Sequence, residues 1–272
     1  MRIGQLGQER PAVRISDDSY IDVSDVTAHF DERFFASGGL SALQQTVTER
    51  QAAGEVWPLN GERIGAPVAR PHQILCIGLN YSDHAAETGQ AIPDEPIVFN
   101  KSPNTLIGPH DCVRIPRGAS KTDWEVELGI VIGARSSYLR DETEAAAAIV
   151  GYVVVNDISE RAFQIERGGQ WVKGKSAETF NPCGPYLVTT EDVPNVLNLG
   201  MWLNVNGVRR QRGNTATMLP TRCRYELRTA DLASARRCHG TRHRLSWNTA
   251  PEGPRRVCAV FRHALAPCRA CA

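Results

Sequence analysis

Apolar and polar positions alternate over short stretches of this chain, a period that is typical of β-strands. Near the N-terminus the pattern predicts strands over 11–15 and 20–23, joined by the turn-forming residues 16–19. A stretch over 58–71 that contains several Pro and Gly residues is expected to be a linker. Residues 1–65 are therefore expected to form a small leading α+β module.

Helical spacing occurs once within that module. Leu40, Leu43 and Val47 recur at intervals of three and four residues, which predicts one apolar helix face. Ser37 is the expected N-cap of this helix, and Gly54 is its expected stop.

Strand patterns outnumber helix patterns in residues 70–218. A run of four Ala in 141–149 predicts the one clear helix there, and Asn206-Gly207 predicts a hairpin turn. Because strands and helices do not alternate regularly, the pattern favours an α+β fold that is mainly β over a doubly wound sheet. The predicted strands are 74–79, 96–100, 125–132, 151–155, 185–188 and 201–205.

Size and composition narrow the class of protein. The chain has 272 residues, of which 42% are hydrophobic, so it can bury a substantial core. It shows no apolar run long enough to span a membrane and no signal-peptide pattern, so a cytoplasmic protein that binds no membrane is expected. The formal net charge of +1 argues against nucleic acid as a partner.

That average charge hides an unusual C-terminal part. Residues 219–272 carry eleven Arg, no Lys and three acidic residues, and they hold five of the eight Cys residues. No strand-like alternation is visible in this segment. A shift of the reading frame near Met218 is the preferred interpretation, which makes 219–272 an aberrant and poorly ordered tail.

Two other interpretations of the tail remain open. A basic arm could bind nucleic acid, although such arms normally contain Lys and few Cys. Cys268 and Cys271 with His263 could form a zinc clip, but a single C-x₂-C pair is a weak signal.

Two carboxylates in an apolar strand are the main candidates for chemistry. Glu125 and Glu127 lie two positions apart in DWEVELGIVIG, so in a strand they share one face, about 7 Å apart along the backbone. Asp157 ends a second apolar strand, in VVVNDIS. Three carboxylates suit a hard divalent cation such as Mg²⁺ or Mn²⁺. The alternative is an exposed strand face on which the acids meet only solvent.

A histidine and a glutamate follow the predicted strand 74–79. His84 and Glu87 are spaced i, i+3 and would share a face of a short helix. A carboxylate bound to one imidazole nitrogen raises the basicity of the other, which could then take a proton from water. The alternative is an ordinary contact on a helix surface.

Three lysines need separate consideration. Gly169–Ser176 matches the phosphate-loop pattern, but no strand precedes it, so nucleotide binding is not expected. A lysine of this loop, Lys173 or Lys175, could instead stabilise a developing negative charge. Lys101 ends a short apolar strand and could be either a contact for a substrate carboxylate or a surface lysine.

Several separated motifs resemble the fumarylacetoacetate hydrolase family in order and spacing. They cover about 70–218, and the similarity stops at Met218, before the helix, strand and Thr-Gly-Thr-Pro loop with which family members continue. The leading module resembles that of bacterial diketo-acid hydrolases and hydroxyheptadienedioate isomerases. The motifs are GLNYSDHAAE, VFNKSPNT, DWEVELGIVIG, VVNDISERAFQIERGGQWVKGKSAETFNPCGPYLVT and NVNGVRRQRGNTATM.

The resemblance implies a fold, a site and a reaction. The fold would be a mixed β-sandwich roll, as a homodimer, with a lid near the dyad. One Mg²⁺ or Mn²⁺ would be held by Glu125, Glu127 and Asp157. The catalytic residues would be His84, Glu87 and Lys175, and the substrate contacts Tyr81, Lys101, Arg161 and Gln164.

The expected function is metal-dependent hydrolysis of a carbon–carbon bond in a 2,4-diketo acid, such as an acylpyruvate or a sugar-derived diketo acid, through a metal-stabilised enolate. An isomerase or decarboxylase of related oxo-acids would use the same cation. A non-catalytic product, either a truncated homologue or a binding protein with a basic tail, is the alternative from another class.

Overall fold

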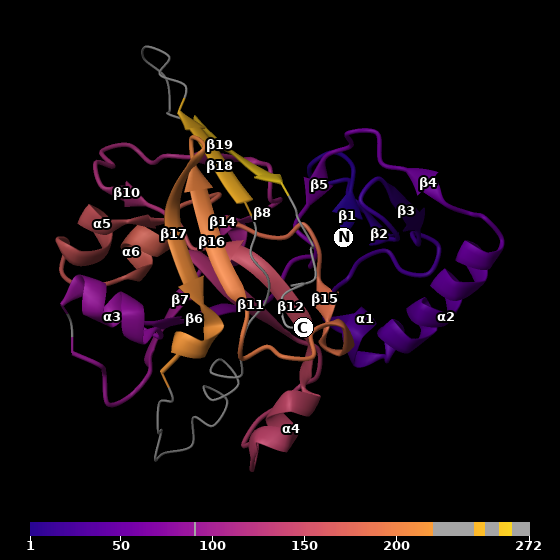
Figure 1. Cartoon of the computed structure of the whole chain (residues 1–272), viewed down its shortest axis with the longest axis horizontal. Coiled ribbons are helices and arrows are strands. Elements are labelled where there is room, and N and C mark those ends of the chain that lie inside the picture. Colours follow the sequence, from indigo (N-terminus) through magenta and orange to yellow (C-terminus); the bar gives the residue numbers. More distant parts are fainter. Residues whose placement is uncertain (90, 220–241, 248–255, 263–272) are drawn as a thin grey trace, which may run out of the picture.

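The computed structural model describes residues 1–89 and 91–219, together with the main chain of 242–247 and 256–262. Figure 1 shows the N-terminal elements gathered on one side of the molecule and the remaining strands and short helices on the other. The described part is mainly β, as the sequence predicted, with several small sheets in place of one large one.

The leading module forms a sheet of its own, in the strand order β4-β3-β2-β1-β5. The strands predicted over 11–15 and 20–23 are confirmed with small shifts at their ends. Part of the expected linker pairs with this sheet. The elements are β1 Arg2–Ile3, β2 Arg10–Arg14, β3 Ser19–Asp22, β4 Trp57–Pro58, β5 Ile64–Gly65, α1 Glu32–Ala36 and α2 Gly39–Ala52.

The start of α2 differs from the sequence prediction. Ser37 ends α1, where its hydroxyl donates to the Phe34 carbonyl at 3.0 Å, so it does not cap α2. The N-cap is Gly38, at φ 73°, where a side chain would be strained. The predicted stop is confirmed, because Gly54 follows the helix in the left-handed region at φ 75°.

The rest of the chain consists of short antiparallel strand pairs and short helices. Most predicted strands are confirmed, but the one expected over 185–188 is reduced to β15, because Pro185 has no N–H to donate to a ladder. The helices are α3 Ser82–Thr88, α4 Glu142–Ala147, α5 Arg161–Ile165 and α6 Val172–Lys175. The strands are β6 Ile74–Gly78, β7 Ile97–Lys101, β8 Leu106–Ile107, β9 Cys112–Arg114, β10 Thr122–Asp123, β11 Val126–Ile132, β12 Ile149–Asn156, β13 Ser159–Glu160, β14 Asn181–Pro182, β15 Val188–Thr189, β16 Gly200–Val205 and β17 Val208–Asn214.

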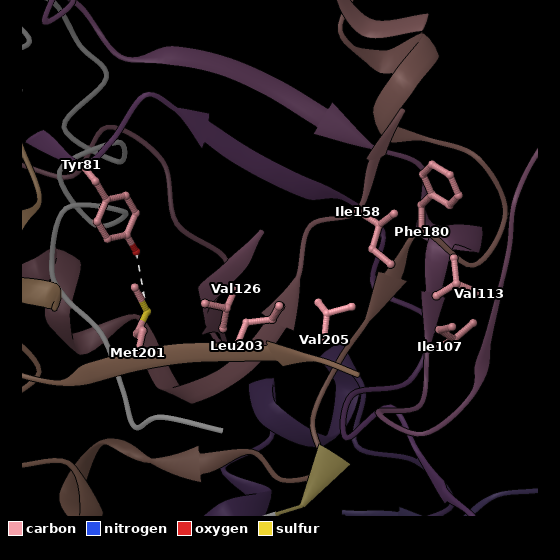
Figure 2. Packing of buried hydrophobic residues seen from close by; sticks show 9 residues of the cluster. All are labelled: Tyr81, Ile107, Val113, Val126, Ile158, Phe180, Met201, Leu203 and Val205. Carbon is pink, nitrogen blue, oxygen red and sulfur yellow. Dashed lines mark hydrogen bonds between the residues drawn. The ribbon is translucent and has the colours of Figure 1, made fainter. Parts of the chain in front are cut away.

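The apolar core of this part lies between the β16–β17 hairpin and the strands β8, β9 and β11. Figure 2 shows the side chains of Val126, Leu203 and Val205 side by side, and the Tyr81 hydroxyl directed at the sulfur of Met201. Gln211 fixes the hairpin to β11, since its side-chain oxygen accepts the Val126 N–H at 2.7 Å. The core therefore supports β11, the strand that follows Glu125 and carries Glu127.

The tail contains two strands that the side-chain pattern did not predict. β18 Arg242–Trp247 and β19 Arg256–Arg262 pair with each other, and β19 pairs with β9. Main-chain hydrogen bonds form these ladders, so no alternation of side chains is required. Apart from Leu219, the remaining tail residues, including those of the suggested zinc clip (His263, Cys268 and Cys271), lie outside the described residues.

No helix within the described residues combines the length and the apolar character that a membrane crossing requires.

Candidate functional site

The register of β11 and β12 places the three predicted metal ligands on one face. Glu127 lies opposite Val155, and the pairing continues past the strand ends, where the Asp157 N–H donates to the Glu125 carbonyl at 2.8 Å. Glu125 and Asp157 are thus opposite neighbours, and side chains two apart on a strand point the same way. The structure brings Glu125, Glu127 and Asp157 to the same end of the strand pair.

Two lysines with almost no exposed surface lie beside these acids. The side chains of Lys101 and Lys175 have exposed fractions of 1% and 2%. Lys101 Nζ donates to Asp157 Oδ1 at 2.5 Å, and Lys175 Nζ donates to Asp157 Oδ2 at 2.7 Å and to Glu125 Oε2 at 2.8 Å. The alternative of a surface lysine is therefore wrong for Lys101, because a buried charge requires partners of this kind.

Arg161 connects the site to neighbouring polar groups. Its guanidinium donates twice to Asp123 Oδ2, at 3.0 and 2.8 Å, and it forms an ion pair with Glu125. Its remaining arm donates to the Gln164 side-chain oxygen at 3.0 Å. Two of the predicted substrate contacts, Arg161 and Gln164, are thus bound to each other next to a predicted metal ligand.

Glu127 differs from the other two acids. Among the described residues, no Lys or Arg forms an ion pair with it, and its partner is the Tyr81 hydroxyl. Burial, followed by the charges of Glu125 and Asp157, raises the pKa of Glu127 to about 8. Glu127 is therefore the one acid of the three without a basic ion-pair partner among the described residues, and its ionised form is disfavoured at neutral pH.

The charges of the two lysines and Asp157 depend on one another. Burial alone would raise the pKa of Asp157, but Lys101 and Lys175 hold it below its usual value. Burial would lower the pKa of Lys175, whereas the carboxylates of Asp157 and Glu125 outweigh that effect and raise it. For Lys101, burial outweighs Asp157 and lowers the pKa.

The donor set fits an oxygen-preferring cation in its chemistry. Across the described part of the chain, no three His, Cys, Asp or Glu side chains converge as a preformed metal cluster. The Lys175 ammonium instead joins Glu125 to Asp157. Three carboxylates without sulfur or imidazole are the ligands that Mg²⁺ or Mn²⁺ prefers, and Glu127 is the one that still lacks a positive partner.

The predicted dyad lies on a helix, as its spacing required. α3 carries both His84, which is half-buried, and Glu87, which is exposed. Residues 217–219, at the junction with the tail, hold the start of this helix. Ser82 Oγ donates to the Thr217 carbonyl at 3.1 Å, and the Leu219 N–H donates to the Asn80 carbonyl at 2.9 Å. The position of α3 therefore depends on 217–219.

Lys175 reaches the acids because two short helices pack closely. A Cβ at Gly174 would lie 2.4 Å from the Glu160 carbonyl oxygen and 2.6 Å from the Gln164 backbone nitrogen. α6 can therefore approach α5 only with glycine at this position. No strand directly precedes this loop, so the structure agrees with the rejection of a phosphate-binding loop.

Two aromatic residues beside Lys175 and one acid were missed by the sequence analysis. Phe99 lies under the Lys175 ammonium, 5.0 Å from Nζ to the ring centroid, and Trp171 packs on Phe99. Asp123 holds Arg161. Phe99 could have been predicted, because it lies two positions from Lys101 and therefore on the same face of the strand. Trp171 could not, because it contacts a strand that is distant in the sequence.

These features define a class of protein: a mainly β fold in which carboxylates and buried lysines lie together at the end of a strand pair. Residues 73–222 match the family described as fumarylacetoacetate (FAA) hydrolase C-terminal. The chain therefore belongs to the fumarylacetoacetate hydrolase family, and the resemblance and the fold inferred from its motifs are confirmed.

Individual relatives support this assignment. A curated protein of Burkholderia multivorans, a hydrolase by name with no substrate specified, is 46% identical over 223 residues, which is 81% of this chain and 77% of that protein. The crystal structure of a probable 2-hydroxyhepta-2,4-diene-1,7-dioate isomerase from Mycobacterium abscessus is 30% identical, with a TM-score of 0.59, over 77% of this chain and 71% of that one.

A third relative shows likeness of fold alone. It is maleylpyruvate hydrolase from Sphingobium sp. SYK-6, solved in complex with manganese (II) ion and pyruvate. It is 24% identical, with a TM-score of 0.65, over 80% of this chain and 78% of that one.

Proposed function

We propose that this chain hydrolyses a carbon–carbon bond in a 2,4-diketo acid with the help of one Mg²⁺ or Mn²⁺. The observation that carries the proposal is the placement of Glu125, Glu127 and Asp157 on one face of the β11–β12 pair, with Glu127 lacking a basic partner among the described residues. These three residues would hold the cation. When bound, the cation would act as a Lewis acid toward the oxo-acid oxygens.

The residues of the chain bind and orient the substrate around that face. Lys175 brings a positive charge next to Glu125 and Asp157, where it stabilises the negative charge that develops on the oxo-acid. Arg161 and Gln164 are held to each other and form one side of the binding face. The Tyr81 hydroxyl lies within reach of both Glu127 and the Met201 sulfur and can donate its hydrogen to Glu127.

Hydrolysis requires a water molecule and a base. His84, oriented by Glu87, removes a proton from water, and the resulting hydroxide adds to the distal carbonyl carbon. The bond between that carbon and the central carbon then breaks, and its electron pair stays with the 2-oxo-acid fragment. That fragment takes back the proton, so the products are a carboxylic acid and a 2-oxo-acid.

The variant Glu87→Gln tests the role of the dyad. It removes the carboxylate but keeps the shape, so we expect acylpyruvate hydrolysis to fall by about 100-fold or more. Exchange of the substrate C3 protons with deuterium, followed by NMR with added Mg²⁺, should persist because it needs no attacking water. Glu191→Gln, at an exposed residue outside the site, is the control. Undiminished hydrolysis by Glu87→Gln would show that the dyad assignment is wrong.

An isomerase or decarboxylase of related oxo-acids is the second candidate. The similarity to the Mycobacterium abscessus isomerase favours it, since that chain is 30% identical. The same carboxylates and Lys175 would serve, but no water would be added to the substrate. Product analysis in ¹⁸O-labelled water separates the two reactions, because only hydrolysis places the label in a new carboxylate.

A further inference from the structure

Lys101 reaches the site because of its position at the end of β7. Side chains alternate along this strand: Val98 is 45% exposed and Asn100 is exposed, whereas Lys101 is 1% exposed. Phe99 shares the inner face with Lys101, and the Lys175 ammonium lies over its ring. Lys101 therefore enters the acid cluster from a different strand pair than Asp157, the carboxylate it contacts.

The ammonium of Lys101 joins a side chain to the adjacent main chain. It donates to Asp157 Oδ1 at 2.5 Å and to the Ile158 carbonyl oxygen at 3.0 Å. Since both acceptors belong to consecutive residues, this pair of bonds fixes the direction of the Asp157 carboxylate relative to its own backbone. Lys175 takes the other oxygen of that carboxylate, and its second acceptor is a side chain, Glu125.

These contacts separate the two lysines by function. Lys175 spans two carboxylates that come from opposite positions of the strand pair. Within the described residues, the Lys101 ammonium donates to one short segment, the Asp157 carboxylate and the neighbouring Ile158 carbonyl. This geometry suits a group that orients the predicted metal ligand Asp157 better than a group that binds the substrate.

We propose that Lys101 is a positioning residue: it sets the direction in which Asp157 presents its carboxylate to the divalent cation, and it does not contact the substrate. The inference rests on the proposed function only in that Asp157 serves as a cation ligand. Groups that hydrogen-bond to metal ligands typically change metal affinity by about 10–100-fold when they are replaced.

Titration calorimetry with MnCl₂ on the full chain tests this role. We expect Lys101→Met to weaken Mn²⁺ binding by about 10–100-fold. Lys101→Arg, which keeps a charge and several donors, should recover part of the loss. Lys121→Met is the matched control. Lys121 is 57% exposed and, within the described residues, its ammonium pairs with Glu166 alone, so this variant should bind Mn²⁺ as the original chain does.

A double-mutant cycle protects the test against a folding defect. Lys101→Met leaves the Asp157 charge without one partner, whereas Lys101→Met with Asp157→Asn removes both charges. If Lys101 acts through Asp157, the double variant should bind Mn²⁺ as weakly as Asp157→Asn alone. Independent, additive losses would overturn the proposal.

One result would assign Lys101 to the substrate instead. That result is unchanged Mn²⁺ affinity in Lys101→Met together with weaker binding of pyruvate, used as a 2-oxo-acid probe, to the Mn²⁺-loaded protein. Such a result would leave the proposed reaction intact. The converse result is also informative. If Lys101→Met weakens Mn²⁺ binding as expected but the original chain hydrolyses no diketo acid, only the proposed reaction is overturned.

Discussion

At the scale of single residues, the candidate site is defined by which carboxylates have basic partners. Glu125 pairs with Lys175 and Arg161, and Asp157 pairs with Lys175 and Lys101. Within the described residues, Glu127 has no such pair. A cation is therefore expected to interact most strongly with Glu127. To bind it, Glu125 and Asp157 would have to give up part of their contacts with the basic side chains.

Arg161→Lys tests whether the fork of the guanidinium matters. Arginine reaches Asp123, Glu125 and Gln164 at once, whereas lysine carries one compact charge and loses this geometry. We expect kcat/KM to fall by roughly 10–100-fold, because misplaced groups lose much of their catalytic effect. Steady-state kinetics with an acylpyruvate as substrate measure this change in kcat/KM. Arg114→Lys, which alters a half-exposed pair with Glu178, should leave kcat/KM unchanged, and an equal loss there would contradict the assignment.

At the scale of elements, the site joins one predictable strand pair to parts that the sequence pattern did not indicate. The two-residue period of strands was sufficient to predict that Glu125 and Glu127 share a face and that Asp157 ends the next strand. The contacts of Lys101, Asp123 and Trp171 could not be predicted in this way. Each depends on how β7, β10 and α6 pack on β11 and β12, which is a matter of tertiary structure.

Gly174→Ala tests the packing of α6 on α5. Alanine favours a helix by up to about 1 kcal/mol over glycine. The added methyl would lie 2.4 Å from a backbone oxygen, which cannot move away as a side chain could, so the steric effect prevails. We expect the free energy of unfolding in urea to fall by about 1–3 kcal/mol. Gly200→Ala is the control, since a Cβ there meets no atom of the described residues within 4 Å. Equal losses in the two variants would contradict the steric explanation.

At the scale of the whole molecule, polar contacts join the leading module to the rest of the described structure, and the family match ends close to the dyad helix. Arg63, from the leading module, donates to Asp111 at 2.6 and 2.5 Å, next to β9. The family match ends at residue 222, just beyond the segment 217–219 that holds α3. Any change of sequence after this point therefore begins next to the dyad helix.

The composition of 219–272 predicts that these residues come from a shifted reading frame. Eleven Arg and five Cys without Lys are typical of translation of GC-rich DNA out of frame. Re-sequencing the locus should show a second open frame that runs past codon 218 and whose translation has an apolar pattern. If no such frame exists, the prediction is wrong. The β18–β19 pair does not decide the matter, because a main-chain ladder forms with many sequences.

The most direct test of the central claim is hydrolysis of acetylpyruvate by the full chain, measured after removal of metal with EDTA and again after addition of MnCl₂ or MgCl₂. The account predicts that activity is lost on chelation, that either cation restores it in the original chain, and that neither restores it in Glu127→Gln. Undiminished hydrolysis by the chelated protein, or full restoration in Glu127→Gln, would contradict it.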